Sequence, residues 1–149
     1  MKKTIIAALV VFLCACGTEA PSEVQPQDTY NALEQYYEGT MEALDEKQIC
    51  TLLNTEEDTV LRAAGAYAAD APEQFFYIVE CKDEDAALDV QEAMKHYLEL
   101  MKDSAQLYSP EQLELISSGY TTVKGNTAIL VICPDGDGVR LKINELYGQ

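Results

Sequence analysis

Apolar residues recur along the chain with two spacings, and these predict a mixed α+β domain. Residues 75–81 and 127–133 are almost entirely apolar, which is typical of central strands buried on both faces of a sheet. Residues 64–69 and 120–124 are weaker segments that we expect to form the edge strands. The dipeptide Gly125-Asn126 fits a two-residue hairpin in which glycine takes a positive φ. The sheet is therefore expected to have four strands and to be largely antiparallel.

Helical spacing marks the segments around these strands. The longest predicted helix covers residues 84–102, with Asp83 as its N-cap. Asp45 and Gln48 have the spacing of a capping box at the start of a second helix. Short helices are also predicted between Asp28 and Gly39, after Ser109 and after Asp135. The residues expected to face the core are Ile49, Leu52 and Leu53 in the second helix, Ala87, Val90, Met94, Tyr97, Leu98 and Met101 in the long helix, and Val139, Leu141, Ile143 and Leu146 in the last.

The predicted element order is a set of short N-terminal helices followed by β-β-α-α-β-β-α. A right-handed crossover between the second and third strands favours the spatial order 3-4-2-1, a circularly permuted ferredoxin-like sheet. In this arrangement strands 2 and 4 are parallel neighbours, so their ends bring Cys81 and Cys133 together. Residues 69–73 are predicted to connect the first two strands, because proline suits a turn better than a central ladder.

The N-terminus has the composition of a bacterial secretion signal. Two lysines precede an apolar run at residues 5–13, and the small residue Ala15 stands directly before Cys16. A membrane-spanning helix is the alternative, but it needs about 20 apolar residues, roughly twice the length of this run. We therefore expect residues 1–15 to be removed as a signal peptide.

The tetrapeptide Leu13-Cys14-Ala15-Cys16 resembles the lipobox of bacterial lipoproteins, in which the last cysteine is acylated and becomes the mature N-terminus. Cys14 stands where that pattern more often has alanine or serine. The resemblance implies a lipid on Cys16 and an extracytoplasmic location at the cell membrane; ordinary secretion is the alternative. Residues 16–28, with two prolines and little to bury, are expected to form a flexible tether. Residues 29–149 then form one domain.

The charge balance limits the partners. The chain carries 26 acidic and 10 basic residues, a net charge of −16. Loss of residues 1–15 removes two lysines and changes the net charge from −16 to −18. Such a surface repels nucleic acid and anionic lipid headgroups, so membrane attachment must come from the lipid on Cys16.

Three cysteines remain in the domain, Cys50, Cys81 and Cys133, and all lie among apolar residues. No pair has the spacing of metal ligands. Buried free thiols are therefore expected. A bridge between Cys81 and Cys133 is the one pairing that the predicted topology allows, since disulfides are permitted outside the cytoplasm.

Residue types that could carry catalysis are scarce. The single histidine, His96, follows Glu92 by one helical turn, which is an ordinary surface pair. The stretch from Asp135 to Gly138 suggests calcium, but an EF-hand would need acidic residues where the chain has Cys133 and Asn144. A strand-to-helix turn capped by Asp135 explains it better. The sequence therefore predicts no catalytic residue, no metal site and no cofactor.

Three short stretches resemble a known family: residues 71–76 (APEQFF), 108–112 (YSPEQ) and 124–127 (KGNT). The chain from about residue 45 to residue 149 is similar to a family of uncharacterised lipoproteins of Gram-positive anaerobes, catalogued as a domain of unknown function. The resemblance agrees with a lipid anchor and implies no substrate, cofactor or catalytic residue.

Two functions from different classes fit these observations. The first is a non-enzymatic, membrane-tethered module that binds a protein or small-molecule partner outside the cell. Its candidate surface is formed by Glu73, Tyr108 and Glu111, because loops held by caps and prolines on a rigid sheet are usual contact sites. The alternative is a small cell-envelope hydrolase, which would need a cleft with two carboxyl groups roughly 5 to 10 Å apart.

Overall fold

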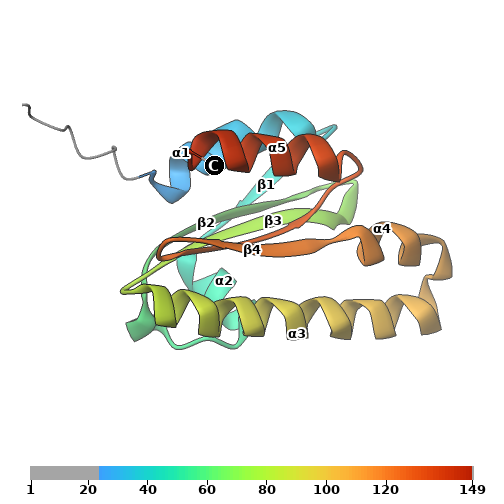
Figure 1. Ribbon diagram of the computed structural model, residues 1–149. Helices are drawn as coiled ribbons and strands as arrows, with labels where there is room; N and C mark the ends of the chain where they lie inside the picture. The colour runs from blue at the N-terminus through green and yellow to red at the C-terminus, as the bar shows by residue number, and fades with distance from the viewer. Residues whose placement is uncertain (1–23, 149) are drawn as a thin grey trace, which may run out of the picture.

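In the computed structural model, which describes residues 24–148, helices cover both faces of one antiparallel sheet (Figure 1). The mixed α+β class is confirmed. Its five strands are β1 (Met41–Leu44), β2 (Val60–Ala68), β3 (Ala71–Cys81), β4 (Tyr120–Lys124) and β5 (Thr127–Ile132). The α-helices are α1 (Pro26–Leu33), α2 (Glu46–Leu53), α3 (Glu84–Tyr108), α4 (Leu113–Ser118) and α5 (Gly136–Leu146), with 3-10 turns η1 (Glu34–Tyr36), η2 (Glu57–Thr59) and η3 (Pro110–Gln112).

The strands lie in the order β1-β2-β3-β5-β4, with every neighbouring pair antiparallel. The predicted order of the last four strands is confirmed. The predicted number of strands is wrong, because the sheet has a fifth strand, β1, which pairs with β2. The edge position predicted for β2 is therefore taken by β1. The predicted parallel pairing is also wrong: β3 and β5 run antiparallel, with Phe75 opposite Ile132 and Glu80 opposite Thr127. The crossover through α3 instead returns the chain to β4, which is parallel to β3 with β5 between them.

The two faces of the sheet carry separate cores. Helices α2, α3 and α4 pack on one face, and α1 and α5 pack on the other (Figure 1). Successive side chains of a strand point to opposite faces, so Phe75 and Tyr77 enter the first core while Phe76 and Ile78 enter the second. This explains why residues 75–79 of β3 and residues 128–132 of β5 are apolar on both faces. Among the helices of residues 24–148, none has the length and apolar content needed to cross a membrane.

The predicted helix starts are largely confirmed. The side chain of Asp45 accepts a hydrogen bond from the Gln48 amide at 2.8 Å, and Gln48 returns one to the Asp45 amide. Asp83 caps α3 by accepting from the Ala86 amide at 2.8 Å. The first helix differs, because α1 begins at Pro26 and Asp28 lies inside its first turn. The last three residues of the predicted tether, 26–28, are therefore part of helix α1.

Some predicted boundaries and core positions are wrong. Helix α3 continues to Tyr108, beyond the expected end at residue 102. Leu52 and Leu141 were expected in the core but are 41% and 71% exposed, because each lies on the solvent side of its helix. Ile49 and Leu53 of α2 are buried as predicted, and Cys50 takes the inward position expected for Leu52.

The three cysteines within residues 24–148 are free and buried, which confirms the thiols expected for Cys50, Cys81 and Cys133. The bridge considered between Cys81 and Cys133 is excluded by the antiparallel pairing of β3 and β5. Cys81 ends β3 and Cys133 directly follows β5, so the two cysteines lie at opposite ends of this strand pair. They also belong to the cores on opposite faces of the sheet.

Thiol labelling should follow this burial. In a form with Cys14 and Cys16 replaced by serine, the native protein is expected to react with almost no maleimide at pH 8. Burial raises the pKa of the Cys81 thiol to about 11, so the reactive thiolate is scarce as well as inaccessible. Unfolding in urea should expose three thiols. Fewer than three reactive thiols without reductant would reveal a disulfide and contradict the pairing described.

Candidate binding site

Strand β3 begins with an irregular segment in which the regular pairing with β2 is interrupted. Tyr67 pairs with Phe75, and the next residue of β2, Ala68, pairs with Ala71. Residues 72–74 therefore lie outside the regular ladder as a bulge. Proline is tolerated at such positions because it has no N–H to donate, and bulges occur frequently beside functional sites. The sequence prediction of a connecting loop at 69–73 is thus wrong in its bounds, since the turn itself is at residues 69–70.

One side of this bulge adjoins a cavity of about 590 Å³, which we call the α2 pocket. This volume falls within the range of about 300 to 1,000 Å³ that is common for small-molecule sites. Helix α2 forms one wall, and the ends of β1, β2 and β3 form the floor. The lining residues are Leu44, Asp45, Lys47, Gln48, Thr51, Leu52, Tyr67, Pro72 and Tyr77.

The floor of the α2 pocket is held in place by close packing. A Cβ at Gly65 would lie 2.7 Å from the Phe76 carbonyl oxygen and 3.2 Å from Ile49 Cδ1, so glycine is what lets α2 approach the sheet. The ring of Tyr77 stacks on Phe75 with 4.6 Å between centroids. Fixed aromatic rings of this kind give a pocket a defined shape before any ligand arrives.

Polar groups surround the mouth of the pocket. Asp45 and Gln48 are engaged with each other's backbone in the capping box, whereas Lys47 contributes an exposed positive charge. The Tyr67 hydroxyl donates a hydrogen bond to the Glu42 carboxylate, and this bond raises the pKa of Tyr67. The arrangement is an apolar basin with an ionic rim, suited to bind an apolar group next to a polar one.

On the other side of the bulge lies a smaller cavity of about 290 Å³, which we call the α3 pocket. It shares Pro72 with the α2 pocket and is completed by the C-terminal part of α3 and by η3. Its lining residues are Pro72, Glu73, Met101, Ser104, Ala105, Ser109, Gln112 and Ile116.

Of the three residues predicted from the sequence to form a partner surface, one lines the α3 pocket and two lie beside it. Glu73 lines the α3 pocket. Tyr108 and Glu111 are exposed beside it, Tyr108 to 81%, but the pocket is lined by their neighbours Ser109 and Gln112. The structure thus brings the bulge and the turn after α3 together. The larger α2 pocket was not predicted, because it depends on β1 and on the bulge, neither of which has a clear signal in the sequence.

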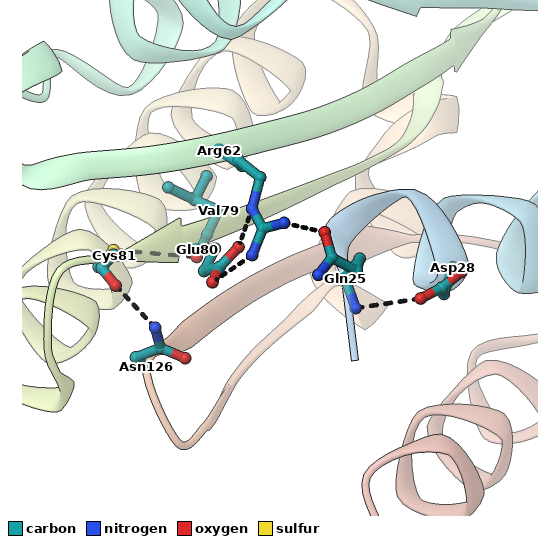
Figure 2. Close-up of polar contacts among 7 residues, drawn as sticks. All are labelled: Gln25, Asp28, Arg62, Val79, Glu80, Cys81 and Asn126. Carbon is teal, nitrogen blue, oxygen red and sulfur yellow. Dashed lines mark hydrogen bonds and ion pairs between the residues drawn. The ribbon is translucent and has the colours of Figure 1, made fainter. Parts of the chain in front are cut away.

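An ion pair between a buried carboxylate and a partly exposed arginine lies on the opposite face of the sheet, beside the start of α1 (Figure 2). Glu80 is 2% exposed, and both of its oxygens accept from the Arg62 guanidinium, at 2.6 Å from Nε and 2.8 Å from Nη2. Arg62 also donates to the side chain of Gln25, the N-cap of α1. Since the carboxylate is fully engaged, we assign the pair a structural role, that of holding α1 to β2 and β3.

The remaining candidates for chemistry lie apart from the two pockets. His96 is exposed, and Glu92 is paired with Lys95 at 2.5 Å. Asp135 Oδ1 accepts from the Gly138 amide at 3.0 Å, which confirms a helix cap at the former calcium candidate. No group of three or more acidic, histidine or cysteine side chains within residues 24–148 is placed to hold a metal ion. Asp135 and Asp137 line a separate pocket of about 440 Å³ together with Arg140. This pocket therefore has two carboxylates in its lining, the residue type that the hydrolase hypothesis requires.

Comparison with known proteins identifies one family. The family model described as Domain of unknown function (DUF4358) matches residues 34–133. This range contains the whole sheet, both pockets and α2 to α4, whereas α1 and α5 lie outside it. No curated protein and no solved structure matches the chain. Cys16, the predicted site of lipid attachment, lies outside the described residues.

Proposed function

We propose a function for a chain that belongs to the family Domain of unknown function (DUF4358): a binding module held outside the cytoplasm by a lipid on Cys16. The proposal assigns the binding to the face formed by the α2 pocket, the bulge at residues 72–74 and the α3 pocket. We call this face the pocketed face. The partner is a protein or a small molecule.

The anchor is supported by the residues that precede the domain. The stretch Leu13-Cys14-Ala15-Cys16 follows a short apolar run, as in bacterial lipoproteins. The strongly acidic composition gives the domain no attraction of its own to anionic lipids. Attachment by acyl chains is therefore the mechanism that fits both the signal and the charge.

The binding role is carried by one observation, the α2 pocket beside the bulge. Its floor of packed aromatic rings and its apolar walls are typical of ligand sites. Its position supports the same role, because α1, through which the chain enters the domain, lies on the opposite face of the sheet (Figure 1). The pocketed face thus lies on the side of the sheet opposite to α1.

The experiment uses two variants of the full-length chain that each gain one reporter cysteine, Leu52→Cys in the α2 pocket and Leu141→Cys on the far face. Both leucines are exposed, and the thiols of Cys50, Cys81 and Cys133 are buried. In this proposal Cys14 leaves with the signal peptide and Cys16 is acylated, so a maleimide that cannot cross membranes should label the reporters alone. In intact cells Leu141→Cys should label rapidly. Leu52→Cys should label about fivefold more slowly in cells than after purification, as expected for about 80% occupancy.

The unmodified chain is the control and should remain unlabelled. If Leu141→Cys were labelled only after cell lysis, the extracytoplasmic location would be wrong. If both reporters were labelled at equal rates in cells and after purification, the pocketed face would be unoccupied, and the binding role assigned to it would be wrong.

A further inference from the structure

Strand β1 leaves an edge of the sheet open directly beside the α2 pocket. In the described residues, β1 pairs with β2 on one side. The Ala69 amide donates to the Thr40 carbonyl at 2.9 Å, and hydrogen-bonded pairs alternate along an antiparallel ladder. The backbone groups of Met41 and Ala43 therefore point away from β2. They offer the donors and acceptors that another strand needs.

The same strand places side chains at the pocket. Leu44 ends β1 and lines the α2 pocket, and its cross-strand partner is Gly65, whose missing side chain lets Ile49 of α2 pack close to the sheet. Glu42 lies on the same face as Leu44, since alternate residues of a strand share a face. A strand added outside β1 would therefore direct every second side chain toward the mouth of the pocket.

Acidic residues predominate along this edge, although the exposed Lys47 of α2 places a positive charge at the mouth of the pocket. Residues 38–46 contain four acidic residues and no basic one. All four, Glu38, Glu42, Asp45 and Glu46, are exposed. Since the whole chain has a net charge of −16, a partner that approaches this edge is favoured if it is basic.

Charged residues on edge strands commonly serve to prevent strand pairing, by projecting into the path of a neighbour. Glu42 is arranged differently. Its carboxylate accepts a hydrogen bond from the Tyr67 hydroxyl, on the strand behind it, and so it lies over its own sheet. The edge is thus acidic without being blocked by this side chain.

We propose that β1 binds an extended, basic peptide segment of a partner protein, which adds a sixth strand to the sheet and inserts an apolar side chain into the α2 pocket. The inference rests on the proposed function and names the chemistry of its partner. Backbone pairing supplies the register, the pocket selects the apolar residue, and the acidic residues along β1 favour lysine or arginine on either side of it.

The probe is a fluorescent ten-residue peptide that alternates lysine with leucine or phenylalanine, titrated against the detergent-solubilised full-length protein by anisotropy. Two peptides are controls. One carries glutamate in place of lysine, and the other keeps the lysines but is N-methylated at its four central residues, which blocks pairing along both edges. Both should bind at least about tenfold more weakly than the probe.

Matched protein variants locate the contact. Leu52→Ser should weaken binding of the lysine peptide about tenfold, whereas Leu141→Ser, an equal change on the far face, should change it less than about twofold. Glu42→Gln keeps an acceptor for Tyr67 and should weaken binding and its salt dependence more than Asp89→Asn, which removes the same charge from α3.

The results separate this inference from the function on which it rests. Equal binding of the N-methylated and unmodified peptides would show that charge alone holds the peptide, and would overturn strand addition. Slow labelling of Leu52→Cys in cells together with no binding of any peptide would also overturn it, while leaving the binding role intact. Specific peptide binding without slow labelling in cells would instead contradict the proposed function.

Discussion

Replacing Cys16 with alanine is expected to abolish incorporation of fatty acid into the protein. Cells fed an alkyne-bearing palmitate should label the unmodified chain, and the Cys16→Ala form should fall to background, because no other residue of the lipobox-like stretch would then carry the acyl groups. The effect is expected to be complete. Each buried methylene contributes about 0.8 kcal/mol to membrane attachment, so losing the chains removes the whole anchor.

Cys14→Ala is the matched control for this experiment. It removes the neighbouring thiol and should keep full labelling, since alanine is a common residue at that position of the pattern. Intact mass of the labelled protein should correspond to a chain that begins at Cys16. Full labelling of Cys16→Ala, or a purified chain that retains residues 1–15, would show that the anchor is misassigned.

Arg62→Met is expected to lower the free energy of unfolding by about 3 kcal/mol. The substitution leaves the Glu80 carboxylate, which is 2% exposed, without the guanidinium that binds both of its oxygens. It also removes the hydrogen bond from Arg62 to Gln25, so the start of α1 should loosen with it (Figure 2). Urea unfolding followed by circular dichroism measures the change.

The double variant Arg62→Met with Glu80→Met separates the cost of a lone buried charge from the loss of packing. Replacing a buried ion pair with apolar side chains of similar volume is often nearly neutral, so the double variant should lie within about 1 kcal/mol of the unmodified chain. A double variant as unstable as Arg62→Met alone would show that the pair stabilises the domain through its own attraction.

Features set by neighbouring residues could be predicted from the sequence. The starts of α2, α3 and α5 follow from aspartates whose side chains accept from amides three residues later, a contact that needs no tertiary partner. The hairpin between β4 and β5 follows from Gly125, which has a φ of +59°. The spatial order of β2 to β5 also followed, because the two strands with long apolar runs, at residues 75–79 and 128–132, have to be central.

Features set by distant partners could not be predicted. Residues 41–44 lack the β-branched and aromatic side chains typical of strands, and they form β1 because β2 offers them a pairing edge. In contrast, the direction of β5 relative to β3 could have been predicted: the crossover makes β3 and β4 parallel, and the hairpin makes β5 antiparallel to β4, so β5 has to run antiparallel to β3. The α2 pocket depends on β1 and on the displaced Pro72, so it was missed with them.

The partner surface predicted from the sequence lies next to two adjoining pockets, the α3 pocket and the α2 pocket. Glu73 and the turn after Tyr108 lie together at the α3 pocket, and Pro72 joins them to the larger cavity. A binding role for this face predicts that the interface extends over the bulge toward α2.

The central claim, that a partner binds the pocketed face in the cell, is tested most directly by a photoreactive amino acid placed at Leu52 or at Leu141 of the full-length chain. Irradiation of living cells is predicted to give an adduct of discrete mass from position 52 and none from position 141. Equal adducts from both positions, or no adduct from position 52 with good incorporation, would contradict the account.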